Sequence, residues 1–287
     1  SVGGTTSNTA VLTAASRLVN VSSRALVGTG QNILIPGFVI NGPAGSTKQV
    51  LIRASGPALS QFSVSGALAN PSLTLLDSTM KVIASNTGWS TNSNASQIAN
   101  VAASVGAFAF PQGSPDCALL VSLSPGAYTF QISGVNSGTG VALAELYEVN
   151  TADSYLMANI SARILAGTAA NTLIAGFVIQ GTQPAKLLIR GDGPTLAQFG
   201  VTGSLAQPVL TVFDSNQKIV ATNTVWGTNS NAAQIASSAT AVGAFALPEK
   251  SADSALLLTL PPGAYTAQVT GANNSSGVAL VEVYQAP

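Results

Sequence analysis

The sequence contains no histidine and one cysteine. Without histidine, the chain lacks the base of Ser–His and Cys–His nucleophile pairs and the imidazole ligands of many zinc and iron sites. One cysteine cannot build a thiolate cluster, and no Gly-Lys-Ser/Thr phosphate-binding motif occurs. We therefore expect a protein that is not an enzyme and that uses no metal and no cofactor.

Charged residues are also scarce. They make up 7% of the chain, and Lys plus Arg (10) balance Asp plus Glu (10). Nucleic-acid binding and membrane-surface binding both need clustered basic residues, and no apolar run approaches the roughly 20 residues of a membrane span. Nucleic acid and membrane are thus not expected partners. So few charges favour a surface that copies of the chain cover. The alternative is a Ser/Thr/Asn-rich surface that stays soluble without charge.

What the sequence does contain is a long internal duplication. The segment 34–40 returns as 173–179, the segment 51–57 as 188–194, and the segment 125–129 as 262–266. A repeat of this length is a domain and not a solenoid unit of about 20–50 residues. We predict an N-terminal extension over 1–16, a first domain over 17–149, a linker over 150–155 and a second domain over 156–287.

Each copy contains short runs of Val, Ile, Leu, Phe and Thr bounded by Gly, Pro, Asn and Ser, which is typical of β-strands. In the first copy these runs are 33–40, 49–53, 72–76, 81–85, 118–123, 127–133 and 140–148. They predict an all-β fold of two tandem antiparallel β-sandwich domains, jelly-roll-like, each with one or two short helices. One helix is expected to begin after Asn94, with Gln97 as the reciprocal capping partner, and another turn after Pro57.

Three stretches carry a family resemblance: 71–77, 82–86 and 123–134, the last containing Pro-Gly-Ala-Tyr-Thr. They resemble bacterial pre-peptidase C-terminal-type β-sandwich domains. More closely, the whole unit resembles an uncharacterised tandem repeat of secreted bacterial surface proteins, over nearly all of both copies but not 1–16. The resemblance implies an extracellular, non-catalytic accessory or structural module. Pre-peptidase domains often carry acidic pairs after the position of Asn86, where this chain has Thr87, so the resemblance does not extend to a calcium site.

The few charges recur at equivalent positions of the two copies, whereas charges on a solvated surface would differ more freely between the copies. Glu145 lies in a strand-like segment with apolar neighbours, and a buried carboxylate needs a partner. We predict structural ion pairs among these residues: Arg24, Arg53 and Glu145 in the first copy, and Arg163, Arg190 and Glu282 in the second. A catalytic or ligand-binding charge cluster is the alternative.

The only tryptophans, Trp89 and Trp226, lie in loops rich in Asn, Ser and Thr. An indole face beside the amides of Asn92 and Asn229 suits stacking on a sugar. The alternative is a tryptophan that plugs the end of the sandwich and donates its N–H to a loop carbonyl.

The N-terminal extension has no counterpart in the second copy. Its strand-like residues Thr9, Val11, Leu12 and Thr13 are candidates for a strand added to a neighbouring subunit; a disordered tail or a link to a missing domain is the alternative. We predict a structural subunit of an extracellular bacterial filament, fibre or surface layer, whose partners are copies of itself. The alternative is an adhesin or carbohydrate-binding module of a larger secreted protein, with glycans as partners.

Overall fold

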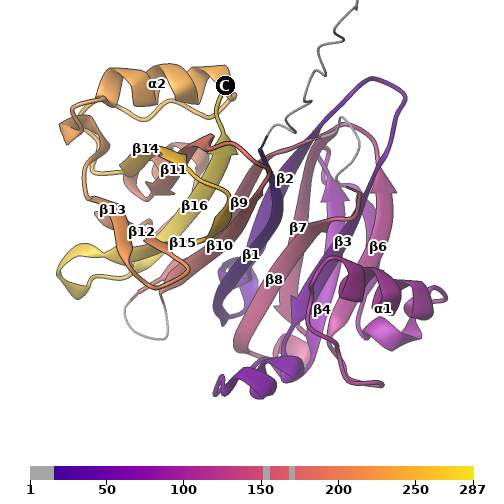
Figure 1. The fold of residues 1–287 in the computed structure, drawn as a ribbon. Coiled ribbons are helices and arrows are strands. Elements are labelled where there is room, and N and C mark those ends of the chain that lie inside the picture. The colour runs from indigo at the N-terminus through magenta and orange to yellow at the C-terminus, as the bar shows by residue number, and fades with distance from the viewer. Residues whose placement is uncertain (1–15, 151–155, 168–171) are drawn as a thin grey trace, which may run out of the picture.

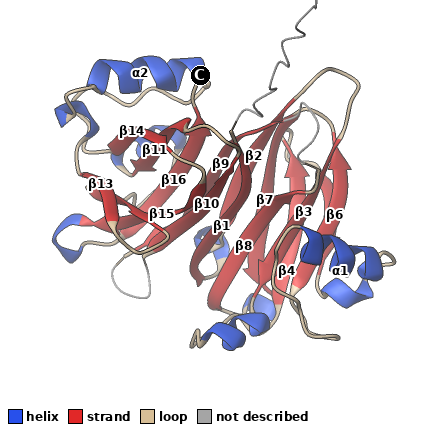
Figure 2. Ribbon diagram, viewed as in Figure 1, coloured by secondary structure: helices blue, strands red, loops and turns tan. Residues whose placement is uncertain are grey.

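The computed structural model describes residues 16–150, 156–167 and 172–287, and it confirms the predicted all-β antiparallel fold (Figures 1 and 2). The first copy contains β1 (Arg17–Val27), β2 (Ile35–Asn41), β3 (Lys48–Ser55), β4 (Pro71–Asp77), β5 (Val82–Asn86), β6 (Cys117–Leu123), β7 (Gly126–Gly134) and β8 (Gly140–Glu148). The second contains β9 (Leu156–Ala166), β10 (Leu173–Gln180), β11 (Ala185–Asp192), β12 (Pro208–Asp214), β13 (Ile219–Asn223), β14 (Ser254–Leu260), β15 (Gly263–Gly271) and β16 (Gly277–Gln285).

Each copy is a jelly roll. In the first copy one half-sheet has the order β1-β8-β3-β6 and the other has the order β2-β7-β4-β5. The first strand therefore pairs with the last, β1 with β8. Moving inward along the sequence, β2 pairs with β7 and β3 with β6, and β4 and β5 form the central hairpin. The second copy repeats this order with β9 to β16. Alternate residues of each strand face the space between the half-sheets, as Phe38 and Ile40 do on β2, and form the main core.

The two copies share their sheets. β1 pairs with β10 and β9 pairs with β2, so that two eight-stranded sheets run through both copies. We call sheet A the one that contains β1 and sheet B the one that contains β2. Ser22 lies opposite Gly176 across one seam, and Ser161 lies opposite Gly37 across the other. Because these pairs are equivalent in the two copies, the copies are related as in a two-fold dimer. The sequence predicted two sandwiches in tandem but not this fusion.

The seams leave no room for a larger side chain beside the serines. A Cβ atom on Gly176 would lie 2.8 Å from the Ser22 Oγ, and one on Gly37 would lie 2.9 Å from the Ser161 Oγ. The glycines thus let two β-strands with small residues meet in register, and they leave a shallow floor on the outer face of each sheet.

Short helices lie in the connections between the strands. The α-helices are α1 (Ala95–Ser104) and α2 (Ala232–Ala241), and the 3-10 helices are η1 (Gly30–Asn32), η2 (Pro57–Phe62), η3 (Trp89–Thr91), η4 (Val135–Ser137), η6 (Pro194–Phe199), η7 (Trp226–Thr228) and η8 (Ala272–Asn274). The predicted helices after Asn94 and Pro57 are present. The Asn94 side chain makes no capping hydrogen bond, and its backbone carbonyl accepts the Ile98 N–H instead. Beneath α1, Ile98 and Ala102 pack on Leu51 of β3 and form a second, smaller core.

Candidate functional site

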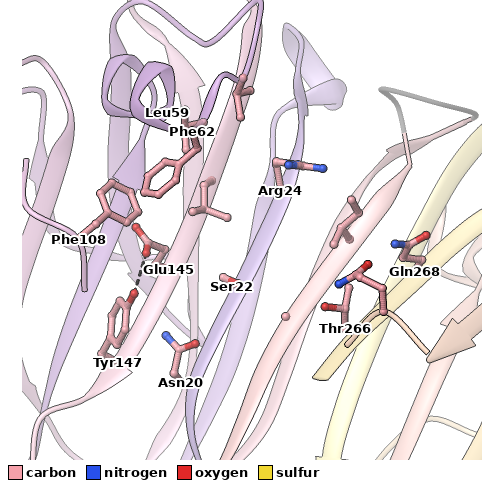
Figure 3. Close-up of a pocket in the computed structure, with 15 residues that line it drawn as sticks. Asn20, Ser22, Arg24, Leu59, Phe62, Phe108, Glu145, Tyr147, Thr266 and Gln268 are labelled. Atoms are coloured by element: carbon pink, nitrogen blue, oxygen red, sulfur yellow. Dashed lines mark hydrogen bonds between the residues drawn. The ribbon is translucent and has the colours of Figure 1, made fainter. Parts of the chain in front are cut away.

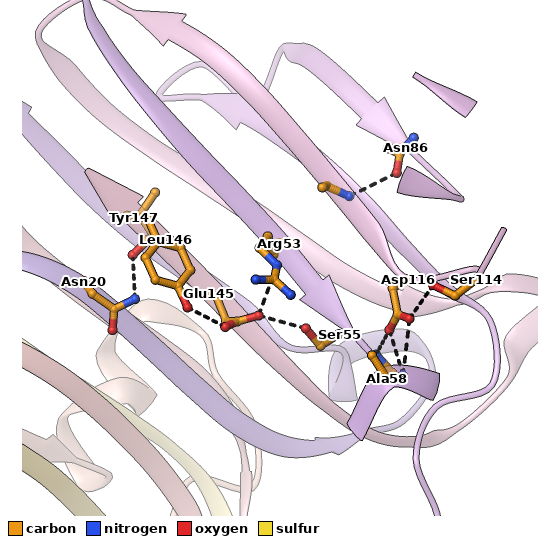
Figure 4. Close-up of polar contacts among 12 residues, drawn as sticks. Asn20, Arg53, Ser55, Ala58, Asn86, Ser114, Asp116, Glu145, Leu146 and Tyr147 are labelled. Atoms are coloured by element: carbon orange, nitrogen blue, oxygen red, sulfur yellow. Dashed lines mark hydrogen bonds and ion pairs between the residues drawn. The ribbon is translucent and has the colours of Figure 1, made fainter. Parts of the chain in front are cut away.

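The predicted pair of Arg53 and Glu145 is formed on the outer face of sheet A, beneath the loop that follows α1 (Figure 4). The Arg53 Nε lies 3.5 Å from the Glu145 Oε2, and its guanidinium lies 3.8 Å from the ring centre of Phe110. The carboxylate accepts hydrogen bonds from Ser55 Oγ (2.8 Å) and from the Tyr147 hydroxyl (2.7 Å). Burial is the main reason why the pKa of Tyr147 is raised. Arg53 and Glu145 are both buried at this position.

In the second copy, Arg190 pairs with Glu282 at 3.2 Å, as predicted, and also with Asp192 at 3.1 Å. Asp192 replaces the Ser55 of the first copy and is fully buried. Burial and the neighbouring Glu282 carboxylate hold the pKa of Asp192 well above its usual value, against the opposing effect of Arg190. The Arg190 Nη1 also donates to the Phe245 carbonyl at 2.8 Å. Arg53 and Arg190 thus both lie in internal ion pairs with a glutamate, although the details differ between the copies.

The predicted ion pairs of Arg24 and Arg163 are not formed with any described residue. Arg24 lies on β1 between the core-facing residues Ser23 and Ala25, so its side chain points to the outer face of sheet A, where it is exposed. Arg163 takes the equivalent place on β9 and faces outward from sheet B. In contrast, Arg17, Arg53 and Arg190 are buried in ion pairs. Arg24 and Arg163 are therefore the arginines that the fold leaves available.

Sequence reasoning missed two structural roles of carboxylates. Glu148, which has no acidic counterpart in the second copy, pairs with Arg17 and, at 3.1 Å, with Lys48. Asp116 is fully buried and accepts the backbone N–H groups of Gly56 (2.7 Å) and Ala58 (3.2 Å), which fixes the start of η2 (Figure 4). Asp253 does the same for η6. The recurrence of Asp116 as Asp253 was the available signal in the sequence.

The tryptophan side chains are buried in the two small cores beneath α1 and α2. Trp89 is 6% exposed and donates its indole N–H to the Pro111 carbonyl at 3.0 Å, while Trp226 is 7% exposed and donates to the Pro248 carbonyl at 2.9 Å. The amides of Asn92 and Asn229 donate to backbone carbonyls, including those of the tryptophans themselves. A buried ring offers no face to a sugar, so these residues do not form the stacking site that their sequence context suggested. The structural alternative accounts for their positions.

The strand candidates Thr9, Val11, Leu12 and Thr13 lie outside the described residues. The chain is first described at Ser16, where the Gln183 N–H donates to the Ser16 Oγ at 3.1 Å. Arg17 follows in the ion pair with Glu148. The base of the N-terminal extension is therefore fixed to the sandwich next to the seam.

A groove of about 530 Å³ lies on the outer face of sheet A, and the first seam runs along its floor (Figure 3). One row of paired residues crosses the floor in the order Glu145, Ser22, Gly176 and Thr266, from β8 to β15. The next row is Leu143, Arg24, Ile174 and Gln268. Phe62, which is 56% exposed, and Phe108 form an aromatic wall on the side of the first copy. Since Glu145 is already paired with Arg53, the free charge of this groove is that of Arg24.

The second seam carries an equivalent groove of about 410 Å³ on the outer face of sheet B. Its residues take the positions of the first groove with the copies exchanged: Ser161, Arg163, Gly37, Ile35, Thr129, Gln131, Leu280, Phe199 and Phe245. Phe199 is 60% exposed, close to the value for Phe62. The chain thus presents the same arrangement of residues twice, on opposite faces. The recurrence of Phe, Thr and Gln at matched positions was visible in the sequence, but only the seam brings them together.

The ends of the sandwich carry the free sheet edges. β5 pairs only with β4 and β13 only with β12, at opposite ends of the molecule. Each of these edge strands exposes two adjacent apolar side chains: Val82 and Ile83 on β5, and Ile219 and Val220 on β13. Edge strands are normally protected by charge or by coverage, and here the flanking cations are single residues, Lys81 and Lys218.

Within the described ranges, no helix has the length and apolar character needed to cross a membrane, and no group of three or more His, Cys, Asp and Glu side chains is placed to hold a metal ion.

No family model matches the chain, and no curated protein matches it. Solved structures with some likeness include tandem CBM51 modules of a family 98 glycoside hydrolase from Streptococcus pneumoniae (8% identity, TM-score 0.25, 88% of this chain and 83% of that chain). Another is the major capsid protein P2 from Bacteriophage PM2 (9% identity, TM-score 0.24, 93% and 98%). At these identities and TM-scores, the likeness supports no conclusion about this chain. The resemblance to pre-peptidase C-terminal domains stays a prediction.

Proposed function

We propose that this chain is a structural subunit of an extracellular bacterial filament, fibre or surface layer and that it assembles with copies of itself. The observation that carries the proposal is the exposure of apolar edge strands at both ends: Val82 is 54% exposed on β5 and Ile219 is 58% exposed on β13. An exposed edge presents unpaired backbone N–H and C=O groups beside these side chains, which is a template for pairing with another chain.

The position of the edges favours open growth. β5 and β6 lie at the end formed by the first copy, and β13 and β14 lie at the end formed by the second (Figure 1). A contact at one end leaves the other end free, so that successive contacts extend a row of subunits instead of closing a dimer. The strands next to the seams cannot take part because each already has two neighbours.

The N-terminal extension supplies a second way to cover an edge. We infer that residues 9–13 add as a strand to a free edge of the next subunit, in the manner of donated strands. The anchored base at Ser16 and Arg17 supports this, because it fixes the point from which the segment leaves. The proposed function includes no catalytic activity; the burial of Arg53, Glu145, Arg190 and Glu282 in internal ion pairs supports this. Its extracellular bacterial location rests on the charge-poor composition and the family resemblance.

Electron microscopy of the purified full chain tests this function. We expect filaments or sheets at micromolar concentration, and we expect Val82→Lys combined with Ile219→Lys to leave single subunits with unchanged circular dichroism, because a charge on an edge strand opposes pairing. Leu26→Lys combined with Leu165→Lys is the matched control, since these residues are 40% and 42% exposed but lie on interior strands. A wild-type chain that stays monomeric, or an edge variant that still polymerises, would overturn the proposal. Deletion of residues 1–15 with normal filaments would reject only the donated strand.

A further inference from the structure

Beyond assembly, the two seam grooves have the character of binding sites. Each has the volume of a ligand cleft, about 530 Å³ and 410 Å³, within the range of roughly 300–1,000 Å³ that such clefts occupy. Each combines an exposed phenyl ring, an aliphatic floor and a few convergent polar groups. Neither groove is required by the edge contacts proposed above, since both lie over interior strands.

Charge selects the ligand. Arg24 and Arg163 pair with no described carboxylate, whereas the other arginines are buried in ion pairs. In the first groove the guanidinium stands in a row with Gln268, and the hydroxyls of Ser22 and Thr266 follow in the next row (Figure 3). A guanidinium binds a carboxylate through two parallel hydrogen bonds, and the amide and hydroxyls can bind neighbouring hydroxyl groups of the same ligand.

The floor favours a sugar over a peptide. Its strands β1 and β10 are paired on both sides, so they have no free backbone edge with which a peptide could align. The groove therefore offers only side chains as hydrogen-bonding groups. Side-chain amides and hydroxyls suit a ligand whose polar groups are mainly hydroxyls. The ring of Phe62, 56% exposed at the wall, offers a flat apolar surface to a pyranose ring.

We propose that the two seam grooves are equivalent binding sites for a carboxylate-bearing carbohydrate, such as a uronate unit of an acidic polysaccharide. Because the first groove faces outward from sheet A and the second from sheet B, one chain holds two polysaccharide strands on opposite faces. A polymer of such chains would gain further from multivalent attachment.

Isothermal titration of the full chain with hexagalacturonate tests the proposal. We expect two sites per chain. Arg24→Ala alone should weaken one of them on the order of tenfold or more, and Arg24→Ala combined with Arg163→Ala should weaken both by this factor, as for the loss of a charge-assisted hydrogen-bond pair. Lys186→Ala combined with Lys250→Ala removes the same charge outside the grooves and should leave the affinity within about twofold. Phe62→Ala should weaken only the first site.

Four results would overturn the proposal: no binding of hexagalacturonate to the wild-type chain, equal losses in the groove and control variants, equal binding of neutral maltohexaose, or equal binding of a hexaglutamate peptide. Electron microscopy of the arginine variants separates this proposal from the structural one. Filaments that persist while the sugar affinity falls show that the grooves act independently of assembly, and arginine variants that lose their filaments would count against the grooves as separate sites.

Discussion

Ser22 on β1 and Gly176 on β10 face each other across the first seam, and their counterparts Ser161 and Gly37 repeat the contact across the second. The pairing is reciprocal: a strand of each copy meets the neighbouring strand of the other copy in the same register. This is the relationship found at a two-fold homodimer interface, here contained within one chain.

Residues 16–150 alone should therefore form a homodimer. In the isolated first copy β1 and β2 become free edges, and Ser22 of one molecule can face Gly37 of another in place of Gly176. Analytical ultracentrifugation should give twice the monomer mass. Residues 156–287 should behave in the same way because β9 and β10 carry the equivalent residues. A stable, soluble monomer of either half would contradict the proposed role of the seam.

Trp89→Ala should destabilise the fold without a specific effect on sugar binding. The side chain is 6% exposed and packs beneath α1, so its removal leaves a cavity that costs roughly 3–5 kcal/mol. Asn92→Ala should cost less, about 1–3 kcal/mol, because it removes hydrogen bonds to the Trp89 and Ala118 carbonyls but no comparable volume. Urea denaturation measures both values. Unchanged stability of Trp89→Ala would show that the indole is not a structural plug.

Arg190→Met should be more damaging than Asp192→Ser. Loss of the guanidinium leaves the carboxylates of Asp192 and Glu282 buried without their counter-charge, which typically costs about 3–5 kcal/mol. Asp192→Ser instead recreates the arrangement of the first copy, in which Ser55 donates to Glu145 beside Arg53. We expect a loss below about 2 kcal/mol for this variant, within the range of ordinary substitutions. Denaturation midpoints that fall equally for the two variants would disprove this ranking.

The sequence predicts the strands that consist of apolar runs, and it predicts the helices after Asn94 and Pro57. It does not reveal β1 as a strand, because Asn20, Ser22 and Arg24 interrupt the apolar residues. Those polar residues alternate with core-facing ones, and their side chains line the floor of a groove on the outer face of the sheet. The groove could not be predicted because its halves come from different copies. Only the pairing of β1 with β10 places Arg24 and Gln268 in one row, with Ile174 between them.

Comparison of the copies predicted that Arg53 and Arg190 are structural, and their burial explains why both recur. The same comparison could not distinguish them from Arg24 and Arg163, which recur equally. The difference is one of coverage: both side chains face outward from sheet A, but Arg53 is buried beneath the loop that follows α1, whereas Arg24 is exposed. A sequence repeat records that a residue is retained, but the covering layer determines whether it is buried.

Asp192 should make the stability of the fold fall as pH rises. Burial and the Glu282 carboxylate raise its pKa above the ordinary value of an aspartate, so the folded state binds a proton more readily than the unfolded state does. Between the unfolded and the folded pKa, the unfolding free energy therefore decreases with increasing pH. Asp192→Asn cannot titrate and should lack this contribution. Burial also raises the pKa of Glu148. The unfolding free energy of the variant should therefore still decrease with rising pH, but with a smaller slope than that of the wild type.

The measurement is a series of urea denaturations of both proteins from about pH 4 to about pH 8, a range that begins near the unfolded pKa of an aspartate. The difference in unfolding free energy, wild type minus Asp192→Asn, should decline as pH rises above the unfolded pKa and should level off above the folded pKa. Glu249→Gln, at an exposed position in the same copy, controls for the loss of one carboxylate and should follow the wild-type curve. Parallel curves for the wild type and Asp192→Asn would mean that Asp192 keeps an ordinary pKa, and that Arg190 neutralises it fully despite its burial.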